Sequence, residues 1–228
     1  MKTGAVIVAA GMSSRMKAFK PMLEIDSESA VRRIILTLRK AGADPIVLVT
    51  GNQAALLEEH VSDLEVVCLR NEQYATTQMI DSAKIGLVYL LDKCDSILFT
   101  PVDVPLFSVG TVRSLLCSKA GIGVPVCGGR EGHPLLLNKQ VVSTLLANSG
   151  EGGLFHAVER SGFAKQKVEV DDEGILFDMD TPADYEKMQK LQKKLSLSVC
   201  RDSTRKYRIK KAGDCPMDTG ETLCGTSI

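Results

Sequence analysis

AVIVAAGMSSRMKAFKP, residues 5–21, joins a short continuous apolar run to a loop rich in small and basic residues. The run from Ala5 to Ala9 ends directly at a Gly-Ser turn, a pattern typical of a strand buried on both faces of a parallel sheet. Such a sheet is covered by helices on both faces, so this stretch predicts an α/β fold.

The chain then alternates between apolar strands and helical patterns. Helical spacing of apolar residues predicts a helix over residues 29–41, with Gly42 as its C-cap. Further strands are expected at 45–49, 64–69 and 96–99, and further helices at 53–60 and 80–91. This βαβ series predicts a doubly wound, mostly parallel sheet with right-handed connections.

The regular alternation of strands and helices stops after residue 120. Short strands are expected at 123–127 and 135–137, and the runs 168–170 and 175–177 bracket an Asp-Asp-Glu-Gly turn as a hairpin would. We therefore expect a small mixed-sheet extension on the substrate side, forming a lid. Thr181 as N-cap, followed by Pro182, predicts a final helix that runs to about residue 195.

The 228 residues fit one such domain plus a tail better than two full domains. We expect the domain to span residues 1–195, with a nucleotide half of about 1–120 and an acceptor-side half of about 121–195. Apolar periodicity stops beyond it, and a basic run leads into a segment rich in Gly, Asp and Thr. Residues 196–228 are therefore expected to be a tail and are a candidate for disorder.

Composition argues against several classes of protein. Apolar residues make up 44 %, enough for a sizeable core, and the formal net charge of zero argues against a nucleic-acid partner. No apolar window is long enough for a membrane span, and the N-terminus lacks a signal-peptide cleavage site, so we expect a cytoplasmic protein. Seven scattered cysteines contain no C-x-x-C pair and are expected to be reduced, with the first four buried. They are Cys68, Cys94, Cys117, Cys127, Cys200, Cys215 and Cys224.

The loop after the first strand has the residues that a phosphate site needs. Gly11, Ser13 and Ser14 can turn backbone N–H groups toward an anion, and Arg15 and Lys20 add two cations. This combination suits a triphosphate, because negative charge must be neutralised as the leaving group departs. The segment matches neither the P-loop nor the dinucleotide fingerprint. An ordinary polar turn is the alternative interpretation.

Two acidic segments complete the pattern. Asp103, in LFTPVDVPL, lies just past the carboxyl end of a predicted strand, where open α/β sheets bind ligands, and its carboxylate could hold Mg²⁺. Asp180, in DMDTP, could reach the same metal if the lid folds back. Either residue could instead serve only the helix that follows it. A loop rich in small and basic residues is followed along the chain by Asp103 and then by Asp180. This order favours a phosphate-binding loop beside a metal site with two carboxylates.

The segments AAGMSSRM, PVDVP, GREGHPLLL and DMDTPADY together resemble the MobA-like NTP transferase family, in particular the nucleotidyltransferases related to molybdenum cofactor cytidylyltransferase. The resemblance covers roughly residues 3–190. It implies a Rossmann-like fold and a Mg²⁺-dependent transfer of CMP from CTP to molybdopterin cofactor, with release of pyrophosphate. The Ala9-Ala10-Gly11 form of the loop resembles the CTP-using branch, since the GTP-using branch tends to have Gly at position 10.

The resemblance also assigns site residues. It implies that the nucleotide is bound by Ala10, Gly11, Ser13, Ser14, Arg15, Lys20, Met79 and Ser82. It implies that Asp103 and Asp180 bind the metal and that Arg15, Lys20 and Asp103 are catalytic. Lys17 stands where the family often has Gly, which implies a different position of the loop or an added phosphate contact. Thr77 also stands where Gly is common, which leaves the identity of the base open.

The GHP segment has an argument of its own. Gly132 and Pro134 restrict the backbone around His133, and Arg130 is close in sequence. A His and an Arg at the mouth of a loop can hold a phosphorylated acceptor. A purely structural His133 is the alternative.

Two other functions stay open. One is another NTP transferase of the same fold, which acts on a sugar phosphate or uses GTP. The other is a non-catalytic nucleotide-binding module that delivers cofactor to an apo-enzyme; a molybdoenzyme apo-protein would then be its partner.

Overall fold

The computed structural model describes residues 1–12, 15–16, 18–147 and 154–193. Eight strands form one sheet in the order β10-β7-β9-β6-β1-β4-β5, and β8 pairs with β7. The strands are β1 (Thr3–Ala9), β4 (Ile46–Thr50), β5 (Val67–Arg70), β6 (Ser96–Pro101), β7 (Ile122–Cys127), β8 (Arg130–Glu131), β9 (Leu135–Asn138) and β10 (Lys165–Glu169). A separate two-stranded ribbon pairs β2 (Glu24–Ile25) with β3 (Glu28–Ser29).

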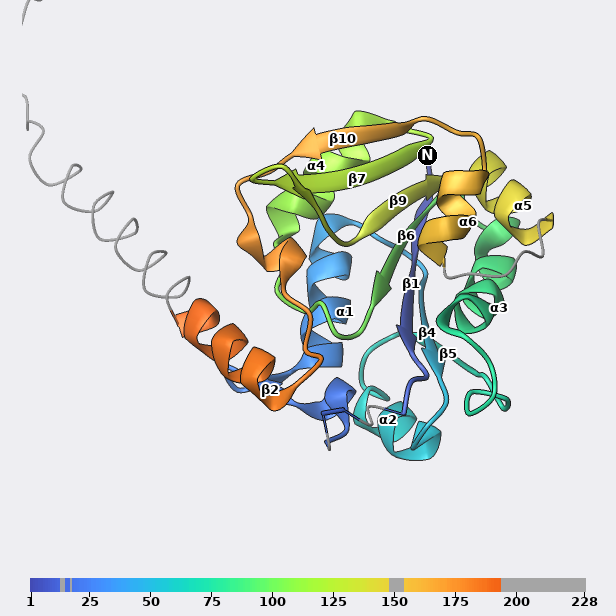
Figure 1. The fold of residues 1–228 in the computed structure, drawn as a ribbon. Coiled ribbons are helices and arrows are strands. Elements are labelled where there is room, and N and C mark those ends of the chain that lie inside the picture. Colours follow the sequence, from blue (N-terminus) through green and yellow to red (C-terminus); the bar gives the residue numbers. More distant parts are fainter. Residues whose placement is uncertain (13–14, 17, 148–153, 194–228) are drawn as a thin grey trace, which may run out of the picture.

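Helices cover both faces of the large sheet, as Figure 1 shows. One face packs against α3 (Met79–Leu91), α5 (Lys139–Ala147) and α6 (Leu154–Arg160). The other face packs against α1 (Ala30–Ala41), α2 (Ala54–His60) and α4 (Val109–Ser118). Short 3₁₀ turns form η1 (Lys20–Met22) and η2 (Glu173–Leu176). This arrangement confirms the predicted α/β fold with a mostly parallel central sheet.

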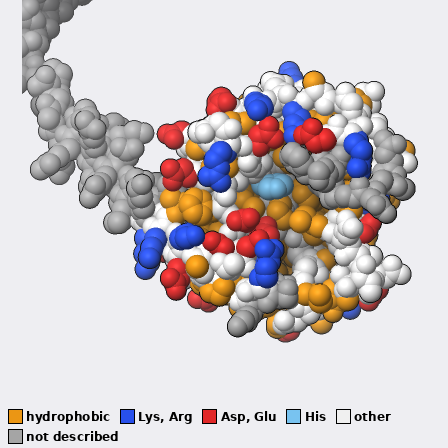
Figure 2. Space-filling view, in the orientation of Figure 1, with side chains coloured by type: hydrophobic (Ala, Val, Ile, Leu, Met, Phe, Trp, Pro, Cys, Tyr) orange, Lys and Arg blue, Asp and Glu red, His pale blue; other side chains and the backbone are white. Residues whose placement is uncertain are grey.

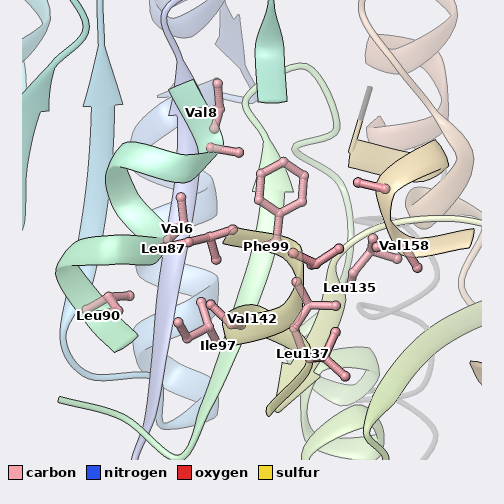
Figure 3. Close-up of a cluster of buried hydrophobic side chains, with 14 of the residues drawn as sticks. Val6, Val8, Leu87, Leu90, Ile97, Phe99, Leu135, Leu137, Val142 and Val158 are labelled. Carbon is pink, nitrogen blue, oxygen red and sulfur yellow. The ribbon is translucent and has the colours of Figure 1, made fainter. Parts of the chain in front are cut away.

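Strand β1 lies at the centre of this sheet, where it pairs in parallel with both β4 and β6. Its side chains alternate between two cores, because successive residues of a strand point to opposite faces. Val6 and Val8 enter the core under α3, whereas Ala5 and Ile7 enter the core under α1. Figure 3 shows the first of these cores, where side chains of β1, α3, β6, β9 and α5 meet around Phe99.

The second half of the chain extends the same sheet and does not form a separate layer. Strand β9 runs antiparallel to β6 and to β7, whereas β10 runs parallel to β7. The extension is thus mixed, as predicted, and continuous with the nucleotide half.

The predicted hairpin over residues 168–177 is wrong. Val168 belongs to β10, whose partner is β7, and residues 173–176 form the 3₁₀ turn η2. Asp172 caps this turn by accepting a hydrogen bond from Gly174 N at 3.0 Å, and its second oxygen accepts one from Ser108 N at 2.8 Å. The Asp-Asp-Glu-Gly segment therefore caps a helical turn and does not reverse a strand.

A helix over residues 182–193 closes the described part of the chain. Thr181 caps it as predicted, since its hydroxyl accepts a hydrogen bond from Asp184 N at 3.3 Å. Gly42 likewise ends α1 in the left-handed conformation, at φ 104°. The predicted end near residue 195 and the predicted tail 196–228 lie outside the described residues.

The four cysteines that the structure describes are free thiols. Cys94 is buried, and Cys68 and Cys127 are partly buried. Cys117 is exposed, so the expectation that it is buried is wrong: it lies on the outer side of α4. Among the described helices, none combines the length and the apolar character that crossing a membrane requires.

Gly86 lies where α3 packs closely against Val6 of β1. A Cβ atom at this position would lie 2.6 Å from Val6 Cγ1 and 3.0 Å from Val6 Cγ2. Because the strand cannot retreat within a closely packed core, Gly86→Ala should lower the free energy of unfolding by about 1–3 kcal/mol. Urea denaturation measures this difference.

Gly110→Ala, in α4, is the matched control. A Cβ there would meet Ser108 Oγ at an ordinary 3.5 Å. Alanine should be neutral at this position or stabilise the helix by up to about 1 kcal/mol. Equal effects of the two substitutions would contradict the proposed tight contact between α3 and β1.

Candidate active site

A cavity of about 170 Å³ opens at the carboxyl ends of β1 and β6. Open α/β sheets bind ligands at this edge, because the loops that leave neighbouring parallel strands diverge there. Figure 2 shows a hollow on the face seen in Figure 1, with hydrophobic side chains in it and charged side chains gathered beside it. The cavity is lined by Val8, Ala9, Ala10, Gly11, Lys20, Pro21, Tyr74, Thr77, Gln78, Met79, Ser82, Pro101, Val102 and Asp103.

Lys20 connects the loop after β1 to both predicted acidic residues. Its Nζ lies 2.8 Å from Asp180 Oδ1 and 3.7 Å from Asp103 Oδ2. The Lys20 side chain is only 11 % exposed, so its charge depends on these carboxylates for compensation. Arg15 Nη2 lies 3.0 Å from the other oxygen of Asp180, while the Arg15 side chain is 72 % exposed.

A backbone hydrogen bond brings the two acidic segments together across the fold. Met179 N donates to the carbonyl oxygen of Asp103 at 2.9 Å. The Met179 side chain is fully buried in a small core with Leu106 and Met188, which anchors the segment before the last helix. The chain between β6 and α4 and the chain before residue 181 are thereby held against each other, with Asp103 and Asp180 facing one ammonium group.

The two carboxyl groups have opposite pKa shifts. Burial raises the pKa of Asp103 above its ordinary value, the charges of Asp180 and Asp178 raise it further, and Lys20 opposes the rise. The hydrogen bond from Lys20 holds the pKa of Asp180 below its ordinary value. Asp180 is therefore well compensated by Lys20 and Arg15, whereas Asp103 needs more positive charge nearby to stay ionised.

This donor set fits a magnesium ion. Mg²⁺ in nucleotide sites is usually held by one or two carboxylates, with waters and substrate phosphates as its remaining ligands. Asp103 and Asp180 face a common cation and are partly exposed, at 24 % and 27 %. No cluster of three or more potential metal-binding His, Cys, Asp or Glu side chains occurs in the described part of the chain. The two aspartates would thus depend on the substrate and on water to complete a metal's coordination.

Asn71 is a site residue that the sequence analysis missed. It directly follows β5 and is only 5 % exposed. Its Nδ2 donates to Thr77 Oγ1 and to Ser82 Oγ, both at 2.9 Å, and its Oδ1 accepts from Gln73 N at 3.0 Å. Asn71 therefore ties the loop that lines one wall of the cavity to the first turns of α3. Its place at the carboxyl end of a strand, like that of Asp103, is the signal that could have found it.

The structure gathers most of the predicted nucleotide residues around one cavity. Those that line it are Ala10, Gly11, Lys20, Met79 and Ser82, and Asp103, predicted to bind the metal, lines it as well. Arg15 and Asp180 join them through the ion pairs described above. Ser13, Ser14 and Lys17 lie outside the described residues.

The predicted acceptor segment lies elsewhere and does not line this cavity. His133 N donates to Ile175 O at 3.1 Å, and the His133 ring packs edge-on against Phe99. Gly132 has a packing role, since a Cβ there would lie 2.3 Å from Ile175 O. Arg130 is exposed on β8, and Pro134 is buried.

His133 is uncharged at neutral pH in this structure. Burial lowers the pKa of His133 to about 4, although a hydrogen bond with the backbone of Phe99 opposes the shift. Its Nδ1 atom is buried and has no hydrogen-bond partner among the residues that the structure describes. A neutral imidazole can offer a ligand one hydrogen bond but no charge, so among the residues predicted for the acceptor only Arg130 could neutralise a phosphate.

Comparison with known proteins relates this geometry to a family. Residues 5–168 match the family model of the MobA-like NTP transferase domain. The molybdenum cofactor cytidylyltransferase of Escherichia coli (strain K12) is 25% identical over 182 residues, which make up 79% of this chain and 92% of that protein. A solved nucleotidyl transferase from Methanothermobacter thermautotroptrophicus has a TM-score of 0.74 at 22% identity, and the match covers 85% of this chain and 99% of that one. This structural likeness shows a shared fold.

A shorter match relates the chain to a longer protein. The bifunctional protein GlmU of Staphylococcus epidermidis is 27% identical over 118 residues, or 51% of this chain. The match spans only 26% of the length of GlmU.

Asn71→Ala should loosen the wall of the cavity. The change removes three side-chain hydrogen bonds, so we expect the free energy of unfolding to fall by about 1–3 kcal/mol. We also expect weaker binding of a nucleoside triphosphate, because residues 73–79 lose their anchor. Urea denaturation and isothermal titration with each NTP measure the two effects.

Asn138→Ala provides the control. Asn138 Oδ1 accepts from Val141 N at 2.8 Å at the start of α5, away from the cavity. That variant should lose about 1 kcal/mol of stability and leave nucleotide binding unchanged. If nucleotide affinity fell equally in both variants, Asn71 would have no specific role in the cavity wall.

Proposed function

Because the chain belongs to the MobA-like NTP transferase family, we propose that it is a Mg²⁺-dependent nucleotidyltransferase that transfers CMP from CTP to the phosphate of molybdopterin cofactor. The observation that carries the proposal is the cluster of Lys20, Asp103 and Asp180 at a cavity that the loop after β1 also lines. Cations and a metal site beside one cavity are what a triphosphate substrate requires.

The reaction needs no covalent enzyme intermediate. An oxygen of the acceptor phosphate attacks the α-phosphorus of CTP in line, the bond from the α-phosphorus to the bridging oxygen breaks, and pyrophosphate leaves with that electron pair. A divalent metal, when bound, would supply electrostatic neutralisation of the phosphates. Asp103 and Asp180 would hold it.

The protein's own residues contribute positioning and charge. Lys20 and Arg15 lie on the loop side of the site, where they would neutralise the β- and γ-phosphates as negative charge develops on the leaving group. Gly11, at the rim, leaves room for phosphate oxygens, because a Cβ there would meet no atom within 4 Å. Catalysis then consists of orientation and electrostatic stabilisation.

The choice of CTP is supported by the cavity wall. Ala10 lines the cavity, and its methyl group leaves less room there than a glycine would. A narrower wall favours the smaller pyrimidine base over a purine. Thr77 and Ser82 line the same cavity and would orient the base, while Asn71 holds both of their hydroxyl groups by hydrogen bonds.

The GHP loop is the candidate contact for the acceptor. His133 Nδ1 is buried and has no hydrogen-bond partner in the described part of the chain, and such atoms are rare in folded proteins unless a ligand or water satisfies them. We propose that the segment from Arg130 to Pro134 contacts the acceptor, with a hydrogen bond from the neutral His133 and charge from Arg130.

Pyrophosphate release measured with each of the four NTPs, in the presence of molybdopterin cofactor and Mg²⁺, tests the activity. We expect release with CTP to be fastest and to require the acceptor. Release with a sugar phosphate in place of molybdopterin would identify another transferase of the same fold. Tight NTP binding without release for any acceptor would indicate a delivery module and contradict the proposal.

Asp103→Asn tests the metal site within this activity. An amide lacks the charge that a divalent metal requires, so the rate of pyrophosphate release should fall at least about 100-fold while the protein stays folded. Asp92→Asn is the control, because Asp92 is 90 % exposed and pairs with Lys139 far along the chain from the site. A folded Asp103→Asn protein with near-normal turnover would remove Asp103 from the catalytic site.

A further inference from the structure

Lys20 occupies the position between the two carboxylates that a metal ion would also use. Its Nζ lies 2.8 Å from Asp180 Oδ1 and 3.7 Å from Asp103 Oδ2. The remaining oxygen of Asp180 is engaged by Arg15 at 3.0 Å. Within the described residues, both aspartates therefore already face protein cations before any ligand binds.

An ammonium group and a divalent ion cannot share this position. Mg²⁺ binds carboxylate oxygens at about 2.0–2.1 Å, so an ion held by both aspartates would lie within a few ångströms of Lys20 Nζ. Two cations this close repel strongly, and the more so because the Lys20 side chain is only 11 % exposed and poorly screened by water. A metal can therefore enter fully only if the ammonium moves away.

The ammonium group of Lys20 can also take a second position, inside the cavity. Lys20 lines the cavity together with Gly11 and Asp103, and its four-carbon stem can swing without moving the backbone. A triphosphate in the cavity would bring anionic oxygens to that side. The ammonium would then exchange carboxylate oxygens for phosphate oxygens, and its charge would stay compensated throughout.

We propose that Lys20 is a resident counter-ion for the metal site, which disfavours binding of a bare divalent cation and is displaced onto the phosphates when metal and nucleotide arrive together. The inference builds on the proposed function, since it assumes that the incoming anion is a triphosphate. It assigns Lys20 a role in the empty enzyme in addition to its role in catalysis. The binding of metal and that of nucleotide then become coupled, and each strengthens the other by the same factor.

Titration of the protein with Mn²⁺ alone, followed by electron paramagnetic resonance, tests this role without nucleotide. Lys20→Met removes the ammonium and keeps the apolar stem, so the variant should bind Mn²⁺ at least about tenfold more tightly than the wild type. Lys20→Arg keeps the charge and should stay within about twofold of the wild type. Because no nucleotide is present, this result can succeed or fail independently of the proposed activity.

Lys139→Met is the matched control for the loss of one positive charge. Lys139 also pairs with an aspartate, Asp92, at 3.1 Å, but away from the cavity. Its Mn²⁺ affinity should equal that of the wild type. Unchanged or weaker Mn²⁺ binding by Lys20→Met would overturn the proposal, and so would an equal gain in Lys139→Met, since the effect would then be one of net charge.

A structural measurement covers the case in which Lys20→Met does not fold. In a structure of the wild-type protein with Mn²⁺ and a non-hydrolysable CTP analogue, Lys20 Nζ should contact phosphate oxygens and no longer contact Asp180. An Nζ still about 2.8 Å from Asp180 Oδ1 with the metal bound to both aspartates would overturn the proposal.

Discussion

Strand β1 is buried on both faces, and much of the molecule is arranged around that constraint. Its partners β4 and β6 pair with it in parallel, so each connection must cross back over the sheet. Helix α1 returns the chain to β4 on one face, and α3 returns it to β6 on the other (Figure 1). The helices that bury β1 leave the carboxyl edge of the sheet open, and this edge carries the cavity.

Electrostatics imposes a second constraint at that edge. Burial raises the pKa of Asp103, and the charges of Asp180 and Asp178 raise it further. Lys20 offsets part of this cost, and Arg15 offsets the charge of Asp180 from the solvent side. Neighbouring carboxylates repel one another when no metal ion lies between them, which lowers the stability of the folded protein. The ammonium group of Lys20, on a flexible side chain, reduces this repulsion.

The part of the chain after residue 120 is joined to the part before it through one sheet and through backbone hydrogen bonds, among them the one from Met179 N to Asp103 O. Strand β9 pairs with β6, whose carboxyl end leads to Asp103. Ile175 O accepts from His133 N, and Met179 N donates to Asp103 O. The segment over residues 175–179 thus touches both the GHP loop and the loop that carries Asp103. Movement of this segment would change both parts of the site together.

The sequence by itself determined the elements that depend on local chemistry. Continuous apolar runs marked β1, β4 and β6, helical spacing marked α1 and α3, and Thr181 marked the start of the last helix, because periodicity and capping act over a few residues. The sequence also showed that the loop after β1 is followed along the chain by Asp103 and then by Asp180. Only the tertiary structure decided which distant groups meet. It paired β10 with β7 where a local hairpin was expected, placed Asn71 where it anchors Thr77 and Ser82 of the cavity wall, and brought Asp180 to Lys20 across 160 positions of the chain. Long-range pairing depends on which buried surfaces and hydrogen-bonding groups satisfy one another in three dimensions, and no short stretch of sequence contains that information.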